Sequence, residues 1–194
     1  LNIIMTIFIS HGAHTCNNNE DNRNFFKEFA KGLSDYSNVL FIYFARPELE
    51  NGIYWEDLCR QDSELLETVS NNKFLEIEIA CINHLENQLK RSDVIYIRDG
   101  STFLLLKSLK NYPDFKDLLR NKVVAASSTG AYCLSKYFYE NDTNEIGEGL
   151  GIFNFKIFCH YDSSSTHAIE KLKSYKEDLP ILALPNYKFQ TLYT

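Results

Sequence analysis

Short apolar runs alternate along the chain with longer stretches in which apolar residues recur at helical spacing. Seven of the runs are rich in β-branched and aromatic residues and almost continuously apolar, as strands buried on both faces require. We predict strands at residues 3–10, 39–45, 74–79, 94–98, 122–127, 155–159 and 181–184. We predict helices at residues 22–33, 55–68, 82–90, 102–110, 114–119, 129–139 and 167–175.

This alternation predicts an α/β fold of three layers, α/β/α, with helices on both faces of a mostly parallel central sheet. The seven strands fit one sheet, and neither a repeat nor a linker divides the chain, so we expect residues 1–194 to form a single domain. The polar stretches 17–23 and 139–149 are predicted loops. Loops that follow the carboxyl ends of parallel strands build the ligand crevice, so functional residues are expected there.

Composition narrows the class of protein. Hydrophobic residues make up 44% of the 194 residues, which is enough for a sizeable core, and the net charge of −6 comes without the basic stripe that nucleic acids require. The five cysteines form no CxxC pair and are odd in number, which predicts free thiols and a cytoplasmic location. The apolar start is shorter than the roughly 20 residues that span a membrane, so no membrane partner is expected.

The most informative segment is a predicted strand that runs through small residues directly into a helical pattern, at residues 122–135. A nucleophile elbow needs small residues two positions before and after the nucleophile, because its turn is tight and the helix returns close to the strand. Ala126 and Gly130 meet this requirement around Ser128, the candidate nucleophile. The backbone N–H of Thr129 is then a candidate oxyanion donor. The alternative is that these small residues only permit close packing or bind an anion.

A serine nucleophile requires a base, and the base is expected at the end of another strand. His160 ends the predicted strand at 155–159 and begins a polar loop. A carboxylate that orients the imidazole can come from the loop after the elbow helix or from the loop after His160. The candidates are Asp142, Glu145, Glu148 and Asp162.

Two further strand ends carry candidate residues. After the strand at 94–98, Gly100 can supply a second oxyanion N–H, and an ordinary capped turn is the alternative. Arg98 and Asp99 are expected to face the crevice there, with Ser101 next to them. The segment 11–16 has three potential metal ligands but no second cluster, so no metal is expected. Its histidines, His11 or the one at position 14, are expected to contact substrate.

Three segments together resemble the peptidase E-like serine peptidases, which include aspartyl dipeptidase and cyanophycinase and share the class I glutamine amidotransferase-like fold. The family's strand followed by G-G-N-T resembles Ile97-Arg-Asp-Gly-Ser-Thr, and its G-x-S-A-G-A elbow resembles Ala126-Ser-Ser-Thr-Gly-Ala. Its G-L-G…P-H resembles Gly149-Leu-Gly followed by Cys159-His160, and Phe44-Ala-Arg-Pro resembles its second strand. The resemblance spans nearly the whole chain.

The resemblance implies a serine peptidase that needs no cofactor. An Asn-Asp pair after the family's elbow helix resembles residues 141–142, which makes Asp142 the preferred acid. Some members place an acid near the chain end, where this chain has Asn186. The implied roles are nucleophile for Ser128, base for His160, and oxyanion donors for Gly100 and Thr129.

The chain departs from the family pattern close to the predicted site. Alanine replaces glycine at Ala126, Thr129 replaces alanine, and Asp99 and Ser101 replace the Gly and Asn of G-G-N-T. A carboxylate at Asp99 opposes negative charge in an oxyanion hole unless it points away.

We therefore expect a serine hydrolase that cleaves small peptides through an acyl-enzyme on Ser128. An arginine in the crevice, Arg98 or Arg46, favours an acidic residue at the cleavage site, and further substrate contacts are expected from Asp99, Ser101 and His11. Two alternatives stay open: a non-catalytic binding or regulatory relative of the same fold, and an esterase or amidase for non-peptide substrates. A small peptide is the expected partner, nucleic acid is not, and a homodimer is one option for the oligomeric state.

Overall fold

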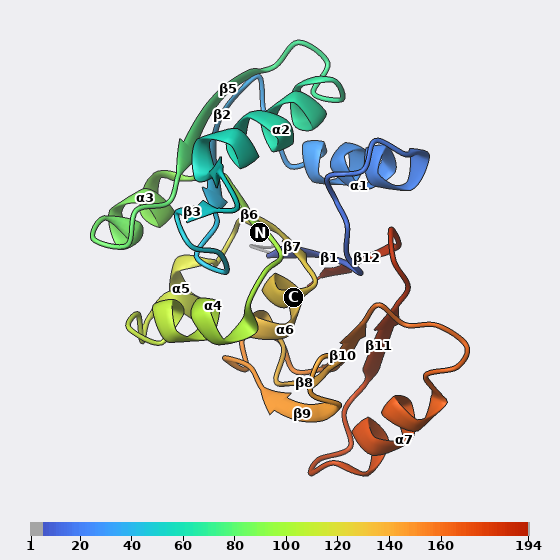
Figure 1. The fold of residues 1–194 in the computed structure, drawn as a ribbon. Coiled ribbons are helices and arrows are strands. Elements are labelled where there is room, and N and C mark those ends of the chain that lie inside the picture. Colours follow the sequence, from blue (N-terminus) through green and yellow to red (C-terminus); the bar gives the residue numbers. More distant parts are fainter. Residues whose placement is uncertain (1–5, 194) are drawn as a thin grey trace, which may run out of the picture.

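The main sheet of the protein has six strands in the order β12-β1-β7-β6-β2-β5 (Figure 1). The computed structural model describes residues 6–193. All neighbouring strands in this sheet are parallel except β1 and β12. Its strands are β1 (Ile7–His11), β2 (Tyr36–Ile42), β5 (Phe74–Ile79), β6 (Val94–Ile97), β7 (Val123–Ser127) and β12 (Phe189–Tyr193).

A second sheet has four strands in the order β11-β10-β8-β9. Strands β8 and β9 form an antiparallel hairpin, whereas β10 is parallel to both β8 and β11. These strands are β8 (Tyr137–Glu140), β9 (Glu145–Glu148), β10 (Lys156–Cys159) and β11 (Ile181–Leu184). A separate two-stranded ribbon is formed by β3 (Leu49–Glu50) and β4 (Ile53–Tyr54).

Helices cover both faces of the main sheet. Helices α1 (Glu20–Ala30) and α2 (Trp55–Glu67) pack on one face, while α3 (Leu85–Arg91), α4 (Thr102–Leu109) and α5 (Phe115–Leu118) pack on the other. The short helix α6 (Thr129–Leu134) follows β7, and α7 (Thr166–Ser174) packs on the second sheet.

Successive side chains of the strands in the main sheet point alternately to its two faces, and helices cover both faces. In β1, Phe8 contributes to the core under α3, α4 and α5, whereas its neighbour Ile9 contributes to the core under α1 and α2. Leu40 and Phe41 divide in the same way in β2. Each pair is almost fully buried, as expected where successive side chains point to opposite faces of a covered sheet.

The predicted fold class, mixed α/β with a mostly parallel central sheet between helices, is confirmed. The prediction of a single sheet is wrong, because the last two predicted strands, β10 and β11, lie in the second sheet. The predicted helix at 129–139 is also too long. It ends at Leu134, and Tyr137 and Phe138 instead pair with β10, where aromatic residues are favoured.

Three smaller predictions need adjustment. The predicted loop at 139–149 contains strand β9, and the predicted loop at 17–23 contains the start of α1. Of the predicted strand at 3–10, residues 3–5 lie outside the described residues. Strand β12 was not predicted, because the adjacent polar residues Gln190 and Thr191 interrupt its short apolar pattern. Among residues 6–193, no helix has both the length and the apolar character needed to cross a bilayer.

Candidate active site

Ser128 lies in the turn between β7 and α6, at the carboxyl end of the main sheet. Its backbone has φ 46° and ψ −106°, an unfavourable conformation for a residue with a side chain. The turn is held because the Ser128 N–H donates to the His11 carbonyl (2.9 Å) and the Tyr132 N–H donates to the Ser128 carbonyl (2.9 Å). At Gly130, a Cβ atom would lie 2.7 Å from the Ile97 carbonyl oxygen, so the helix needs glycine there. The predicted strand–turn–helix is present.

His160 lies beside the Ser128 hydroxyl. The distance between Ser128 Oγ and His160 Nε2 is 3.1 Å, within hydrogen-bond range, although the residues come from different sheets. Burial is the largest cause of a lowered pKa at His160, and nearby His14 lowers the pKa further, while the hydrogen bond with Asn186 opposes both. A lowered pKa keeps the imidazole neutral at neutral pH, which is the form that can accept a proton.

Asn186 contacts the other nitrogen of the His160 ring. Its side-chain oxygen Oδ1 lies 2.8 Å from His160 Nδ1. Because a carboxamide oxygen only accepts, Nδ1 must carry the hydrogen, which leaves Nε2 of the neutral ring free to accept one from Ser128. Asn186 therefore fixes the tautomer that a serine nucleophile requires.

The turn that carries Asn186 is held by close backbone packing. The Tyr161 N–H donates to the Leu184 carbonyl (3.0 Å), directly before this turn. On its other side, a Cβ atom at Gly12 would lie only 1.9 Å from the Pro185 carbonyl oxygen. Only glycine allows the loop after β1 to approach this closely, so Gly12 helps to place Asn186.

The predicted acid Asp142 does not occupy the position behind His160. It is exposed in the turn of the β8–β9 hairpin, where Glu140 pairs with Glu145, and it forms no hydrogen bond with His160. The hairpin was predicted as a loop, and from its turn Asp142 acts on His160 only as a nearby charge that raises the pKa of the ring. Glu148 binds Lys176, Asp162 accepts hydrogen bonds from Ser164 and Ser165, and Glu145 is exposed in β9. The sequence signal for Asn186 is its position directly after the last parallel strand.

The loop between β6 and α4 approaches the turn at Ser128. Gly100 has φ 150°, and a Cβ atom there would lie 2.5 Å from the Ala45 carbonyl oxygen. The Thr129 hydroxyl donates to the Gly100 carbonyl oxygen at 2.7 Å, so the two predicted oxyanion residues are in direct contact. Within residues 6–193, neither the Gly100 N–H nor the Thr129 N–H donates to a protein acceptor. Both remain available to a ligand.

Asp99 is turned toward an arginine. Its carboxylate Oδ1 lies 3.0 Å from Arg46 Nη2, and Arg46 Nε donates to the Asp99 backbone carbonyl at 3.1 Å. The guanidinium therefore balances the negative charge of Asp99 beside the two predicted oxyanion donors.

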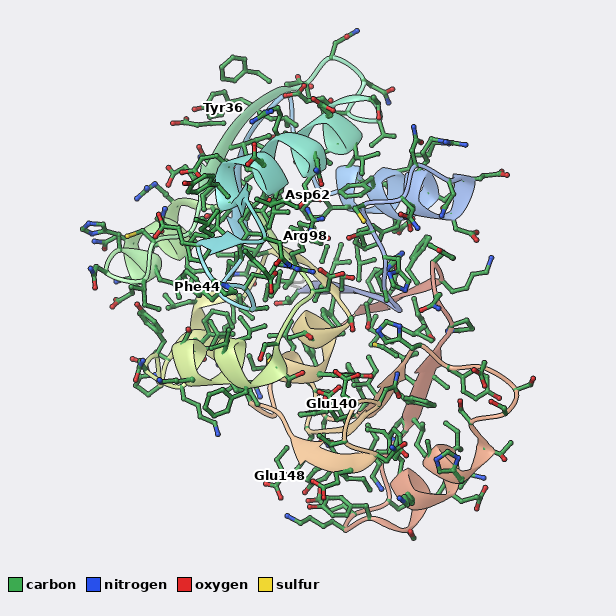
Figure 2. All side chains as sticks on the ribbon, in the orientation of Figure 1. Tyr36, Phe44, Asp62, Arg98, Glu140 and Glu148 are labelled. Carbon is green, nitrogen blue, oxygen red and sulfur yellow. The ribbon has the colours of Figure 1, made fainter. Side chains whose placement is uncertain are left out.

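Arg98 is buried rather than exposed in the crevice, which corrects its prediction as a substrate contact. Only 4% of the residue is exposed, and its Nη1 lies 2.8 Å from Asp62 Oδ2 in α2 (Figure 2). Burial raises the pKa of Asp62 to about 6, while the Arg98 charge and the hydrogen bond from the Tyr43 hydroxyl oppose the rise. At neutral pH this is a buried ion pair that fixes the end of β6 against α2.

His11 is likewise a structural residue, so its prediction as a substrate contact is wrong. It is fully buried, its Nδ1 accepts from the Ala13 N–H (3.2 Å), and its Nε2 therefore donates to Asn22 Oδ1 (3.0 Å). Burial lowers its pKa to about 4. His14 is better placed: it is exposed, and its ring centroid lies 5.5 Å from that of His160.

Ser101 is exposed and caps α4 by accepting from the Leu104 N–H at 3.4 Å. The capping role agrees with the sequence, and its contact with substrate stays a prediction. Residues 6–193 contain no group of three or more His, Cys, Asp or Glu side chains arranged to hold a metal ion.

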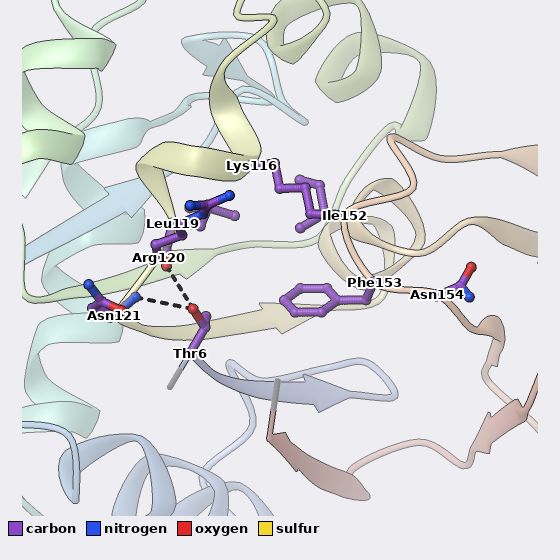
Figure 3. Close-up of a pocket in the computed structure, with 8 residues that line it drawn as sticks. All are labelled: Thr6, Lys116, Leu119, Arg120, Asn121, Ile152, Phe153 and Asn154. Atoms are coloured by element: carbon purple, nitrogen blue, oxygen red, sulfur yellow. Dashed lines mark hydrogen bonds between the residues drawn. The ribbon is translucent and has the colours of Figure 1, made fainter. Parts of the chain in front are cut away.

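Two cavities differ in their relation to Ser128. One of about 550 Å³ lies beside Thr6 and Asn121, which precede β1 and β7 (Figure 3). Ser128 follows the five-residue β7, so this cavity lies about 16 Å away, at the opposite end of the strand. The second, of about 720 Å³, is lined in part by Arg46, whose side chain contacts Asp99, but Ser128, His160 and Gly100 are not among its lining residues. Its other lining residues include Phe44, Trp55, Ile79, Ile82, Leu104 and Lys107.

Comparisons with known proteins find solved structures with a similar fold. A peptidase from an acI-B1 Actinobacterium has 16% sequence identity and a TM-score of 0.66, with 97% of this chain and 84% of that chain covered. A protein from Listeria monocytogenes EGD-e, assigned as a peptidase E, has 19% identity and a TM-score of 0.65, with 98% of both chains covered. A search of curated proteins finds no significant match. The model of peptidase family S51 matches residues 6–189, and the chain belongs to this family of serine-type peptidases.

Proposed function

We propose that this chain hydrolyses small peptides through an acyl-enzyme on Ser128. The observation that carries the proposal is the 3.1 Å distance between Ser128 Oγ and His160 Nε2, in a ring whose other nitrogen is held by Asn186. In this assignment Ser128 is the nucleophile, His160 the general base and acid, and Asn186 the residue that orients the ring.

The proposed reaction has two halves. Ser128 Oγ attacks the scissile carbonyl carbon while its proton passes to His160 Nε2, and the N–H groups of Gly100 and Thr129 bind the resulting oxyanion. His160 then gives this proton to the leaving amine, the C–N bond breaks, and the acyl-enzyme forms. Water attacks the ester in the second half, with His160 again taking a proton and returning it to Ser128.

An asparagine behind the histidine changes the electrostatics of this reaction. A carboxamide orients the ring as a carboxylate does, but it contributes no negative charge to stabilise the imidazolium that forms during proton transfer. Papain-like proteases use the same amide in their Cys-His-Asn sites. We therefore expect catalysis that depends more on the oxyanion donors than it does in an enzyme with a charged third residue.

The substrate class follows from the size and charge of the surroundings. The cavity of about 720 Å³ beside the oxyanion loop has the volume of a small ligand and a mainly apolar lining, which supports a short peptide with an apolar side chain. Arg98 and Arg46 are both engaged in ion pairs, so neither is free to select an acidic residue. The five cysteines are free, which supports a reducing compartment such as the cytoplasm.

The proposal is tested with a mixture of dipeptides to hexapeptides, including members that begin with aspartate and members with leucine or phenylalanine at each position. Mass spectrometry should detect cleavage by the wild-type protein and none by Ser128→Ala or His160→Ala. A wild-type protein that binds peptides without cleaving them would support the non-catalytic alternative. Turnover of acyl esters alone would support the esterase alternative, and either result would refute the proposed peptidase activity.

A further inference from the structure

A side-chain hydrogen bond joins the helix after Ser128 to the loop that carries the second oxyanion donor. The Thr129 hydroxyl donates to the Gly100 carbonyl oxygen at 2.7 Å, and Thr129 is only 3% exposed. Bulk water therefore has little access to this hydroxyl, and its bond to Gly100 is strengthened by the low local polarity.

This bond completes the restraint of one peptide unit in the loop. The unit between Gly100 and Ser101 is held at its carbonyl by Thr129 and at its N–H by the Ala45 carbonyl, at 2.7 Å. Both hydrogen-bonding ends of the unit are thus fixed by residues from neighbouring strand ends.

The preceding peptide unit carries the proposed oxyanion donor itself. Its carbonyl, from Asp99, accepts from Arg46 Nε at 3.1 Å. In a trans peptide the N–H points opposite to the carbonyl, so this bond fixes the direction of the Gly100 N–H. Arg46 thus sets where that N–H points, while Thr129 sets how far Gly100 lies from the turn at Ser128.

The Thr129 hydroxyl has no other evident structural task. Helix α6 has no side-chain cap, so the hydroxyl does not cap the helix. The close contact between this turn and the Ile97 carbonyl is made at Gly130 and does not involve Thr129. A β-branched side chain has few allowed rotamers, which favours a single hydroxyl position. Thr129 and Asp99 are both departures from the family pattern described above, and both contribute to holding this loop.

We propose that the Thr129 hydroxyl is a positioning group that sets the spacing between the two oxyanion donors, its own N–H and that of Gly100. The inference rests on the proposed function, because it assigns a task within the same site. The hydroxyl itself does not contact the substrate. It acts through Gly100, and a small displacement of such a donor is enough to slow a reaction about tenfold to a hundredfold.

The test measures the rate of phosphonylation of Ser128 by a fluorophosphonate probe, whose phosphoryl oxygen enters the oxyanion hole. Thr129→Val keeps the shape of the side chain and removes the hydroxyl, and Thr129→Ser keeps the hydroxyl. The matched control is Thr68→Val, because the Thr68 hydroxyl also donates to a backbone carbonyl, that of Leu65, at the end of α2.

We expect Thr129→Val to lower the maximal labelling rate at least about tenfold, with little change in probe affinity, and Thr129→Ser to restore most of it. Thr68→Val should label like the wild type. Equal maximal rates for wild type and Thr129→Val would overturn the inference, as would a serine variant no faster than the valine variant. If the valine variant does not fold, Thr129→Ala carries the same test. A wild-type protein without any Ser128 adduct would instead refute the proposed function.

Discussion

Replacing Asn186 with aspartate adds a negative charge behind His160 with almost no change in size. The wild-type contact is 2.8 Å long, so the new carboxylate can accept the same hydrogen bond from Nδ1. A carboxylate stabilises the imidazolium over the neutral ring, whereas the carboxamide favours it much less. We therefore predict that Asn186→Asp raises the pKa of His160 and speeds reactions that pass through the imidazolium.

The size of the effect follows from the position of the two groups. Opposite charges about 4 Å apart attract by about 1 kcal/mol in water and about 4 kcal/mol near a protein surface. Asn186 is exposed and His160 is half-buried, so the attraction between the new carboxylate and the imidazolium should lie near the lower of these values, at about 1–2 kcal/mol. Since about 1.4 kcal/mol corresponds to one pH unit, the acid limb of the activity profile should move up by about one unit. At pH values above this limb, the rate at which the probe labels Ser128 should rise about tenfold.

The assay is the rate of fluorophosphonate labelling between about pH 4 and pH 9, which reports the pKa of the base in the free enzyme. Asn186→Ala should slow labelling at every pH, because the ring loses its fixed tautomer. Asp142→Asn is the matched control for charge, and it should move the limb only slightly, toward lower pH, because the Asp142 charge raises the pKa of His160 from an exposed position without a hydrogen bond to the ring. A profile of Asn186→Asp that coincides with that of the wild type would refute the assignment of Asn186.

Three further predictions concern the residues around the site. Asp62→Ala leaves the Arg98 charge buried without its partner and should cost about 3–5 kcal/mol of unfolding free energy in urea titrations. His11, with its pKa lowered to about 4, stays neutral when folded but binds a proton when unfolded below about pH 6.5, so this residue contributes a loss of stability of about 1.4 kcal/mol for each unit by which the pH falls between these values. The raised pKa of Asp62 acts in the opposite direction in the wild type and in the variant alike, so the difference in unfolding free energy between His11→Asn and the wild type should change by this amount per pH unit, in favour of the variant as the pH falls. Gly12→Ala should displace the turn of Asn186 and slow labelling at least about tenfold.

Each of these predictions has a control and a contrary outcome. Glu86→Ala breaks the exposed ion pair with Lys90 and should cost less than about 1 kcal/mol, and an equal cost for Asp62→Ala would show that burial is unimportant. His84 is exposed, so His84→Asn should keep the wild-type pH slope, and a His11 variant with that same slope would contradict the assignment. Unchanged labelling in Gly12→Ala would show that the turn tolerates displacement.

The contact between the candidate nucleophile and the candidate base could be predicted because both are marked by local sequence signals. The elbow at Ser128 depends on small residues within a few positions of it, and His160 is marked by the end of its strand. Asn186 was not predicted as the partner of His160, because its place depends on how the turn after β11 packs against Gly12, far away in the sequence. Arg98 was misassigned for the same reason, since its partner Asp62 lies in another element.

The fold shows the same division between local and long-range information. Five of the six strands of the main sheet were predictable from their apolar runs, whereas β12 was not. Strand β8 was missed because its aromatic residues continue the apolar spacing of α6, and only pairing with β10 decides between helix and strand. The separation into two sheets depends on which strands pair with one another, and the hydrophobic pattern of a single strand does not specify its partner.

The proposed function requires that Ser128 is a nucleophile activated by His160. Peptide mapping of the fluorophosphonate adduct tests it most directly, because it distinguishes Ser128 from Ser127, which is fully buried. We expect one adduct, on Ser128, in the wild-type protein, none in Ser128→Ala, and a rate reduced at least about a hundredfold in His160→Ala. An adduct on another residue, or a folded wild-type protein that gains no adduct, would contradict it.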